Sequence, residues 1–292
     1  MNYGPLVFLT AFVALSASWF GFVLTPQIQI GRLTESTNTL NTAELYPKAR
    51  PGQAAQGLQV YRANGCAACH TQQTVQEGTS IDVYLLEVGT NAAAVATALV
   101  NANVGFTRID DPGFFLNLPK NILPGTTIEA AKRAFKGAQS AGAKAQIRIN
   151  PQGTDIARHW GVRGSVAADY LFDQPVMLGS QRVGPDLSNV GARLPDVNWH
   201  LLHLYAPQQV VKGSLMPPHR FLFNVSKAGQ HPSPDALQVP PEVAPAPGYE
   251  VVPKPEALAL AAYLVSLNSS TPVFETPMTL ASSATSTNSP AK

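Results

Sequence analysis

The sequence is poor in cysteine and in charge. Two cysteines among 292 residues exclude a small scaffold held together by several disulfides. Charged residues make up 13% of the chain, and 20 basic against 18 acidic residues leave a net charge of +2, which argues against capture of nucleic acid by charge. The sequence offers no internal repeat, glycine-rich phosphate loop, nucleophilic triad or paired-carboxylate signature. Its chemistry therefore depends on where the two cysteines lie.

An uncharged apolar run stands near the N-terminus. Residues 5–25 read PLVFLTAFVALSASWFGFVLT, about the 20 residues that a helix needs to cross a bilayer. A cleaved signal peptide is the alternative, but the run has no basic segment before it, and the small-x-small triplet Ala14–Ser16 falls in its middle. We predict an uncleaved membrane anchor over residues 1–30. Flanking charge does not set its orientation, because Arg32 is the first basic residue.

Both cysteines belong to one motif. Cys66, Cys69 and His70 form C-x-x-C-H, the attachment signature of a c-type haem. Two thiols at this spacing can form thioethers with both vinyl groups of one haem, and the adjacent histidine becomes an iron ligand. A thioredoxin-like redox pair would not need the histidine, and a zinc site would need further cysteines or histidines nearby. We therefore predict one covalently attached haem c and, since such haems are attached outside the bacterial cytoplasm, an N-terminus on the inner side.

The regions around this motif predict a helical haem domain, residues 31–75 and 155–270. Residues 53–64 and 255–267 carry apolar residues at helical spacing, and a packed first and last helix resembles small c-type cytochromes. For the sixth iron ligand we favour Met216, which begins a stiff Met-Pro-Pro segment. Met177 and a histidine such as His203 or His219 remain the alternatives.

Longer motifs suggest a family. The chain carries LGSQRVGPDLSNVGAR, then WHLLHLYAP, then SLMPP. With the N-terminal anchor and GCAACHTQ, these resemble the membrane-anchored mono-haem subunit (subunit II) of cbb3-type haem-copper cytochrome c oxidases over residues 1–75 and 156–225. The resemblance implies an electron-transfer subunit that is not catalytic alone. It also implies a bacterial inner-membrane location with the haem domain in the periplasm. The implied partners are a membrane catalytic haem-copper subunit and other cytochrome c subunits.

The resemblance also implies roles for individual residues. His70 and Met216 would ligate the haem iron. The carbonyl of Pro185 would accept a hydrogen bond from the Nδ1–H of His70 and orient its ring. Arg193 would lie near a haem propionate. An ordinary turn and a surface arginine are the alternatives for Pro185 and Arg193.

The chain departs from this family by an insertion, residues 76–154. Its pattern predicts a small β-α-α-β-α-β unit, with a strand at 81–88, helices at 92–100 and 128–140 and a strand at 144–149; Thr127 is the expected cap of the second helix. The unit resembles the C-terminal domain of the bacterial ribosomal stalk protein, but that fold likeness carries no function. We interpret it as a docking or packing module whose ends lie close together.

The fold class expected overall is a mainly α, cytochrome c-like domain with one N-terminal transmembrane helix and this inserted α/β domain. A proline-rich surface loop is expected at about 226–253 and a flexible tail at 271–292. Two other functions remain open. One is a membrane-tethered cytochrome that serves a periplasmic dehydrogenase. The other is a haem-based sensor or binding module, in which carbon monoxide would readily bind the ferrous haem.

Overall fold

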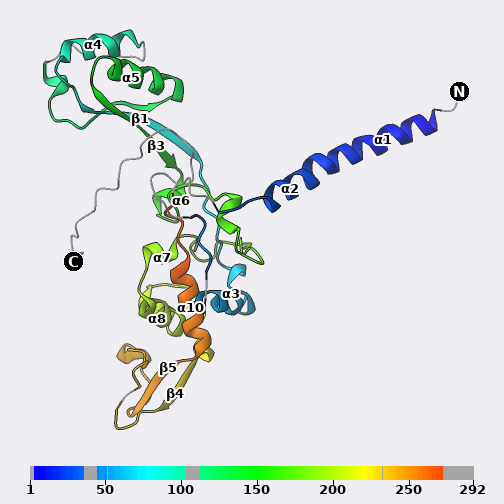
Figure 1. The fold of residues 1–292 in the computed structure, drawn as a ribbon. Helices are drawn as coiled ribbons and strands as arrows, with labels where there is room; N and C mark the ends of the chain where they lie inside the picture. Colours follow the sequence, from blue (N-terminus) through cyan, green and yellow to red (C-terminus); the bar gives the residue numbers. More distant parts are fainter. Residues whose placement is uncertain (1–2, 36–44, 51, 103–111, 232, 272–292) are drawn as a thin grey trace.

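The computed structural model describes residues 3–35, 45–50, 52–102, 112–231 and 233–271. Figure 1 shows an N-terminal helix that extends away from the rest of the chain, a central helical part and an α/β part. The tail expected at 271–292 lies outside the described residues apart from Thr271.

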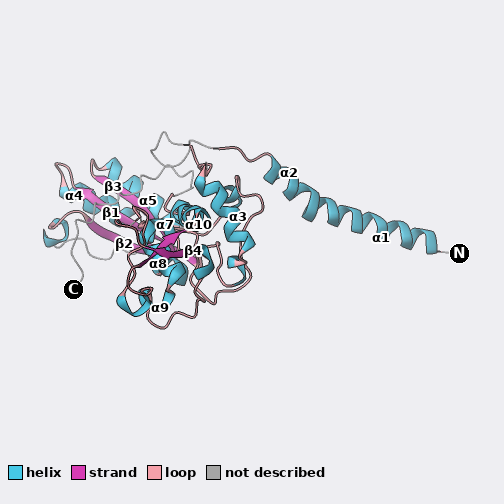
Figure 2. Ribbon diagram, turned by 90° about the horizontal axis from the view of Figure 1, so that it is seen from below, coloured by secondary structure: helices cyan, strands magenta, loops and turns pink. Residues whose placement is uncertain are grey.

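The N-terminal helix is continuous from Gly4 to Gly31. It consists of α1 (Gly4–Trp19), a π-helical turn (Phe20–Leu24) and α2 (Thr25–Gly31). An 18-residue stretch of it has a mean hydropathy of 2.1, and among the described residues it is the one helix long and apolar enough to span a membrane. Figure 2 shows it projecting from the remainder of the chain, consistent with the single-pass anchor expected at 1–30.

Pro26 accounts for the π-helical turn. Proline lacks an N–H, and its ring collides with the carbonyl four residues earlier in a regular helix. Widening the preceding turn relieves that collision. Thr25 directs both its backbone N–H and its hydroxyl to the carbonyl of Phe20, the hydroxyl at 2.8 Å. The carbonyl of Phe20 therefore accepts two hydrogen bonds from Thr25 within the helix.

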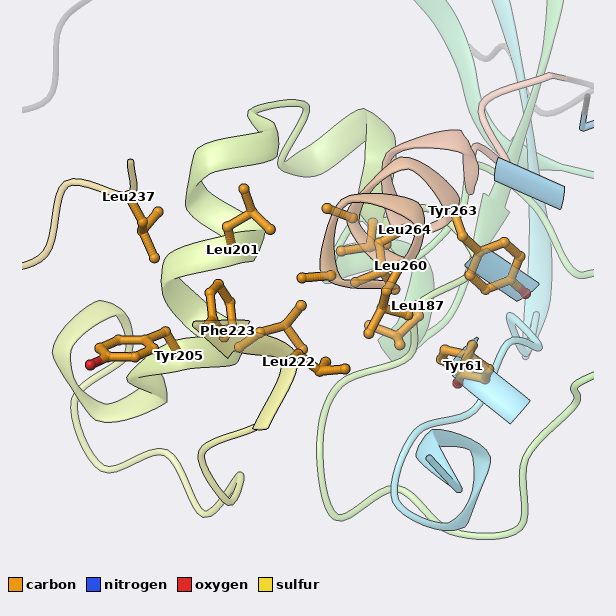
Figure 3. Packing of buried hydrophobic residues seen from close by; sticks show 14 of the residues in the cluster. Tyr61, Leu187, Leu201, Tyr205, Leu222, Phe223, Leu237, Leu260, Tyr263 and Leu264 are labelled. Atoms are coloured by element: carbon orange, nitrogen blue, oxygen red, sulfur yellow. The ribbon is translucent and has the colours of Figure 1, made fainter. Parts of the chain in front are cut away.

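The central part is built around α3 (Gln53–Ala63) and α10 (Pro255–Ser266), the two helices predicted from the apolar spacing. These helices pack on each other, and α7 (Val190–Arg193) and α8 (Val197–Tyr205) pack on α10. The rings of Tyr61 and Tyr263 meet between the helices with centroids 5.3 Å apart. Figure 3 shows these two tyrosines with Leu187, Leu201 and Leu260 in one apolar cluster.

Gly57 permits the close crossing of α3 and α10. A Cβ atom at this position would overlap the carbonyl oxygen of Ala259 and lie 2.6 Å from the Cβ of Tyr263. Any side chain would therefore push the helices apart along a buried contact.

We expect Gly57→Ala to lower the free energy of unfolding by about 2–3 kcal/mol, because an overpacked core must shift its backbone. Urea unfolding followed by circular dichroism measures the loss. Gln56→Ala, at the exposed neighbouring position of α3, is the control and should leave stability unchanged. Equal stability of the two variants would contradict the tight crossing.

The insertion folds around its own core. Its elements are β1 (Gly78–Glu87), α4 (Ala92–Asn101), β2 (Lys120–Thr126), α5 (Ile128–Ser140) and β3 (Lys144–Gln152), and the antiparallel sheet has the order β2-β1-β3. Val83 and Leu85 of β1 are fully buried with Val95 and Leu99 of α4. The hydroxyl of Thr127 caps α5 by accepting the N–H of Ala130 at 3.3 Å, as expected.

Two details of the insertion differ from or extend the expectation. The second of the three expected helices is not found in the described part of the connection from α4 to β2, where Pro112–Phe115 form a single 3-10 turn. The described order is thus β-α-β-α-β. The ends of the insertion do lie together, because Gly78 pairs with Gln152 across β1 and β3.

The proline-rich segment is more ordered than a surface loop. Its ends form an antiparallel hairpin of β4 (Phe223–Lys227) and β5 (Tyr249–Pro253). Leu237, between the strands, is buried and donates its N–H to the carbonyl of Val251 at 2.8 Å. The expectation of a loop over 226–253 was wrong at both ends, because residues that retain an N–H there pair with each other and with the core.

Short elements complete the described chain: 3-10 turns at Cys66–Ala68, Ala167–Tyr170, Arg220–Leu222 and Pro241–Val243, α6 (Thr154–Ala157) and α9 (Pro207–Val210). The chain as a whole is mixed α/β rather than mainly α, because the insertion and the hairpin contribute two sheets. The cytochrome c-like fold of the central part stays a prediction.

Candidate functional site

The C-x-x-C-H motif forms a tight turn directly after α3. Gly65 adopts a left-handed conformation (φ 65°), and Cys66–Ala68 continue as a 3-10 turn. The N–H of His70 donates to the carbonyl of Cys66 at 3.0 Å. Cys66 begins this turn and Cys69 directly follows it.

The two cysteines are free thiols in different surroundings. Cys66 is half-buried, whereas Cys69 is exposed. Burial raises the pKa of the Cys66 thiol to about 11, so this thiol is protonated at neutral pH. Both are available for covalent attachment of a ligand.

The segment that follows the motif is bound to the loop at 178–187. The N–H of Gly184 donates to the carbonyl of Cys69 at 3.0 Å, and the N–H of Leu187 donates to the carbonyl of Thr71 at 2.8 Å. Between them, Nδ1 of His70 lies 2.8 Å from the carbonyl oxygen of Pro185. A carbonyl only accepts, so Nδ1 carries the proton and Nε2 keeps a free lone pair.

Asp186 links the segment after His70 to the loop that carries Pro185. Its side chain is fully buried and accepts from the hydroxyl of Thr71 at 2.5 Å and from the backbone N–H groups of Gln73 and Ser188, each at 2.8 Å. Three donors on one carboxylate fix the segment after His70 against the Pro185 loop. Sequence reasoning missed this residue; its position in the Gly-Pro-Asp-Leu turn was the only signal.

All the predicted site residues except Cys69 line one apolar pocket, whose empty space is about 620 Å³ with its open mouth included. The pocket brings together Cys66, His70, Pro185, Arg193 and Met216. Aliphatic and aromatic residues form most of the remaining wall: Tyr61, Leu187, Val190, Leu194, Trp199, Leu204, Leu260 and Leu264. Cys69 and Met177 are not among the lining residues; Met177 packs against the outside of the helical core.

The loop that carries Met216 is fixed on both sides. Gly213 takes a positive φ of 78°, and the N–H of Met216 donates to the hydroxyl of Ser214 at 3.3 Å. After the two prolines, the N–H of His219 donates to the carbonyl of Leu204 at 2.7 Å. The half-buried thioether is thereby held at the pocket wall.

Arg193 is the cation of the pocket. Its Nη2 donates to the carbonyl of Asp186 at 2.8 Å, whereas its Nε is buried without a hydrogen-bond partner. Burial lowers the pKa of this guanidinium, which still leaves it charged at neutral pH. No aspartate or glutamate lines the pocket in the described part of the chain, so the wall favours an anionic group beside Arg193.

Helix α8 contributes two histidines with different surroundings. Nε2 of His200 lies 2.8 Å from the carbonyl of Leu194, so this ring is satisfied within the protein. The ring of His203 stacks on Trp199 with centroids 4.9 Å apart and an interplanar angle of 11°, and its buried Nδ1 has no partner. His219, the other histidine considered as a ligand, does not line the pocket, although its Nδ1 is also buried without a hydrogen-bond partner.

Comparison with known proteins supports the expected oxidase-subunit family in part. A family model described as cytochrome C oxidase, mono-heme subunit/FixO matches residues 122–243. The matched stretch contains Pro185, Arg193 and Met216, and it begins after the C-x-x-C-H motif. No curated protein matches the chain. The family match supports a mono-haem subunit of a cytochrome c oxidase complex as the kind of protein that this chain resembles.

Proposed function

We propose that the chain is the electron-transfer subunit of a cbb3-type terminal oxidase and that one covalently attached haem c occupies the pocket. The observation that carries the proposal is the His70–Pro185 hydrogen bond of 2.8 Å in the wall of an apolar pocket that also contains Cys66 and Met216. When bound, the haem supplies a one-electron ferric/ferrous couple.

The residues present fit a haem. The pocket wall provides an imidazole nitrogen with a free lone pair and a thioether, the ligand pair of high-potential c-type cytochromes. Cys66 begins a 3-10 turn that Cys69 directly follows, and the C-x-x-C-H spacing suits attachment of both thiols to a single macrocycle. Nε of Arg193 is buried and has no acceptor, and either of the two carboxylates of a haem bound in this pocket would provide one.

Each residue then has a distinct task. Cys66 and Cys69 bind the haem through thioethers, and His70 and Met216 hold its iron. Pro185 fixes the tautomer and the ring orientation of His70, and Asp186 fixes the loop that carries Pro185. The leucines of the wall exclude water, which favours the reduced, less charged iron.

The N-terminal helix anchors this site to a membrane. We place the helix in the bacterial inner membrane and the haem domain in the periplasm, because c-type haems are attached on that side. There the chain passes electrons to the membrane catalytic haem-copper subunit, beside other cytochrome c subunits. The mean hydropathy of 2.1 over an 18-residue stretch of Gly4–Gly31 and the oxidase-subunit family match support this location.

Purification of the tagged chain in mild detergent tests the proposal. Visible spectra and mass spectrometry should find a covalent haem on this chain, together with haem b and copper in a partner that binds carbon monoxide. A c-type spectrum without such a partner would contradict the oxidase assignment and favour a tethered cytochrome that serves another enzyme. A chain without covalent haem would overturn the proposal altogether.

The insertion should be dispensable for haem attachment. Its core is separate from that of the central part, and Thr79 faces Pro151 across β1 and β3. Deleting residues 80–150 and joining these two residues should therefore leave the haem content per chain unchanged, as measured by absorbance of the denatured protein. Loss of haem would show that the insertion supports the haem domain; loss of oxidase assembly with haem retained would make it a docking element.

A further inference from the structure

The pocket contains more unpartnered polar atoms than the proposed ligands use. Tyr61 Oη, Arg193 Nε and His203 Nδ1 are buried at or beside its wall and have no hydrogen-bond partner. Buried donors and acceptors are nearly always paired, so each of these atoms indicates a group that the occupied pocket would provide. A haem carboxylate would provide the acceptor for Nε of Arg193. The proposed function assigns no partner to Nδ1 of His203.

His203 is held rigidly. It lies one helical turn after Trp199 on α8, so the two side chains share a face, and their rings stack almost in parallel. The neighbouring His200 also lines the pocket, but its Nε2 is bonded to the carbonyl of Leu194, whereas the buried Nδ1 of His203 has no partner. The stack fixes the plane in which Nδ1 of His203 presents its hydrogen or its lone pair.

The electrostatic surroundings of His203 favour a neutral donor. Burial, and to a smaller extent the rings of His70, His200 and His219, together lower its pKa to about 4. Arg193, His200 and His203 all line the pocket, and the Arg193 guanidinium also lowers the pKa of His200. A neutral imidazole at this place can donate one hydrogen bond without adding a second buried charge.

We propose that His203 donates its Nδ1–H to a carboxylate of the haem, beside Arg193. This inference rests on the proposed function, because it requires a haem in the pocket. Arg193 supplies the charge that balances the carboxylates, and His203 supplies a directional donor from the rigid α8. Tyr61 is less suited to this role, since its electrostatic neighbours are Cys66, Tyr263 and Asp186 at the attachment side.

The test compares two substitutions in the haem-loaded full chain. His203→Phe retains a ring that stacks on Trp199 and removes the donor, whereas His203→Gln retains a donor.

We expect His203→Phe to keep the covalent haem and the methionine–iron charge-transfer band and to alter the propionate modes in resonance Raman spectra. It should shift the equilibrium constant for reduction about threefold to tenfold toward the ferric form, because one hydrogen bond to a charged group is lost and part of its energy differs between oxidation states. His203→Gln should restore most of both properties, and His231→Gln, at an exposed position, is the matched control.

Unchanged Raman modes and reduction equilibrium in His203→Phe would overturn the proposal. Loss of the six-coordinate spectrum in that variant would also overturn it, by making His203 an iron ligand. Failure of the proposed function is distinguished beforehand by the wild-type chain, which would then carry no covalent haem.

Discussion

Met216→Ala is expected to leave the haem covalently attached and to open its sixth coordination position. The substitution leaves His70 and the two cysteine–haem bonds unaffected, but it removes the methionine sulfur at the pocket wall. The ferrous protein should then bind carbon monoxide, which the wild-type haem resists. Its reduction potential should fall, since thioether ligation raises the potential of a c-type haem. Visible spectra with and without carbon monoxide and a potentiometric titration measure both effects.

Met177→Leu provides the matched control. Met177 is half-buried and packs against the same helical core, yet it does not line the pocket. The substitution conserves volume and should leave spectrum and potential unchanged. Binding of carbon monoxide by Met177→Leu, together with an unaltered Met216→Ala, would contradict the ligand assignment. A six-coordinate Met216→Ala haem would indicate that a histidine of the pocket takes the position.

Local sequence was sufficient where the chemistry is local. The attachment motif needs only a tight turn after a helix, and a glycine at 65 followed by Cys66–Ala68 forms it. The two helices at Gln53–Ala63 and Pro255–Ser266 were predicted within one residue, because each carries an apolar stripe and α10 begins with Pro255. The Met-Pro-Pro segment indicated Met216, the family resemblance added Pro185 and Arg193, and the structure places all three at the pocket that His70 lines.

Interactions that depend on tertiary packing could not be predicted from sequence. Asp186 is a buried acceptor for three donors only because the segment after His70 lies alongside its loop. His200 and His203 occupy the same helix, but only the ring of His200 contacts a backbone carbonyl, and Nδ1 of His203 has no partner. The hairpin of β4 and β5 pairs residues more than 20 positions apart across a proline-rich stretch, a pairing with no local signal.

The insertion shows the same division. Its two helices were predicted from their residue pattern and, for α5, from the cap Thr127. The strand β2 contains Pro124 and Gly125, residues that disfavour a strand, and it pairs irregularly with β1 at the sheet edge. Edge position and bulges allow such residues in a sheet, and neither condition is visible before the sheet is assembled.

Gly184→Ala should disturb the haem site directly, because the added methyl group meets the ring of His70 itself. A Cβ at this position would lie 2.8 Å from Nδ1 and 2.9 Å from Nε2 of His70. Relief of that contact must move either the ring or the loop, and both moves break the 2.8 Å hydrogen bond to Pro185. Loss of an orienting partner of this kind typically weakens a metal–ligand bond about tenfold or more.

The expected result is a lower yield of covalent haem per chain and, in the haem that is attached, a partly five-coordinate spectrum. Heat denaturation of the haem band should occur at a lower temperature, while the insertion, which has a separate core, should unfold as in the wild type. Gly78→Ala is the control, since nothing lies within 4 Å of the atom that it adds. Wild-type haem content and spectrum in Gly184→Ala would mean that the loop yields without cost, and that the Pro185 carbonyl does not fix the ring of His70.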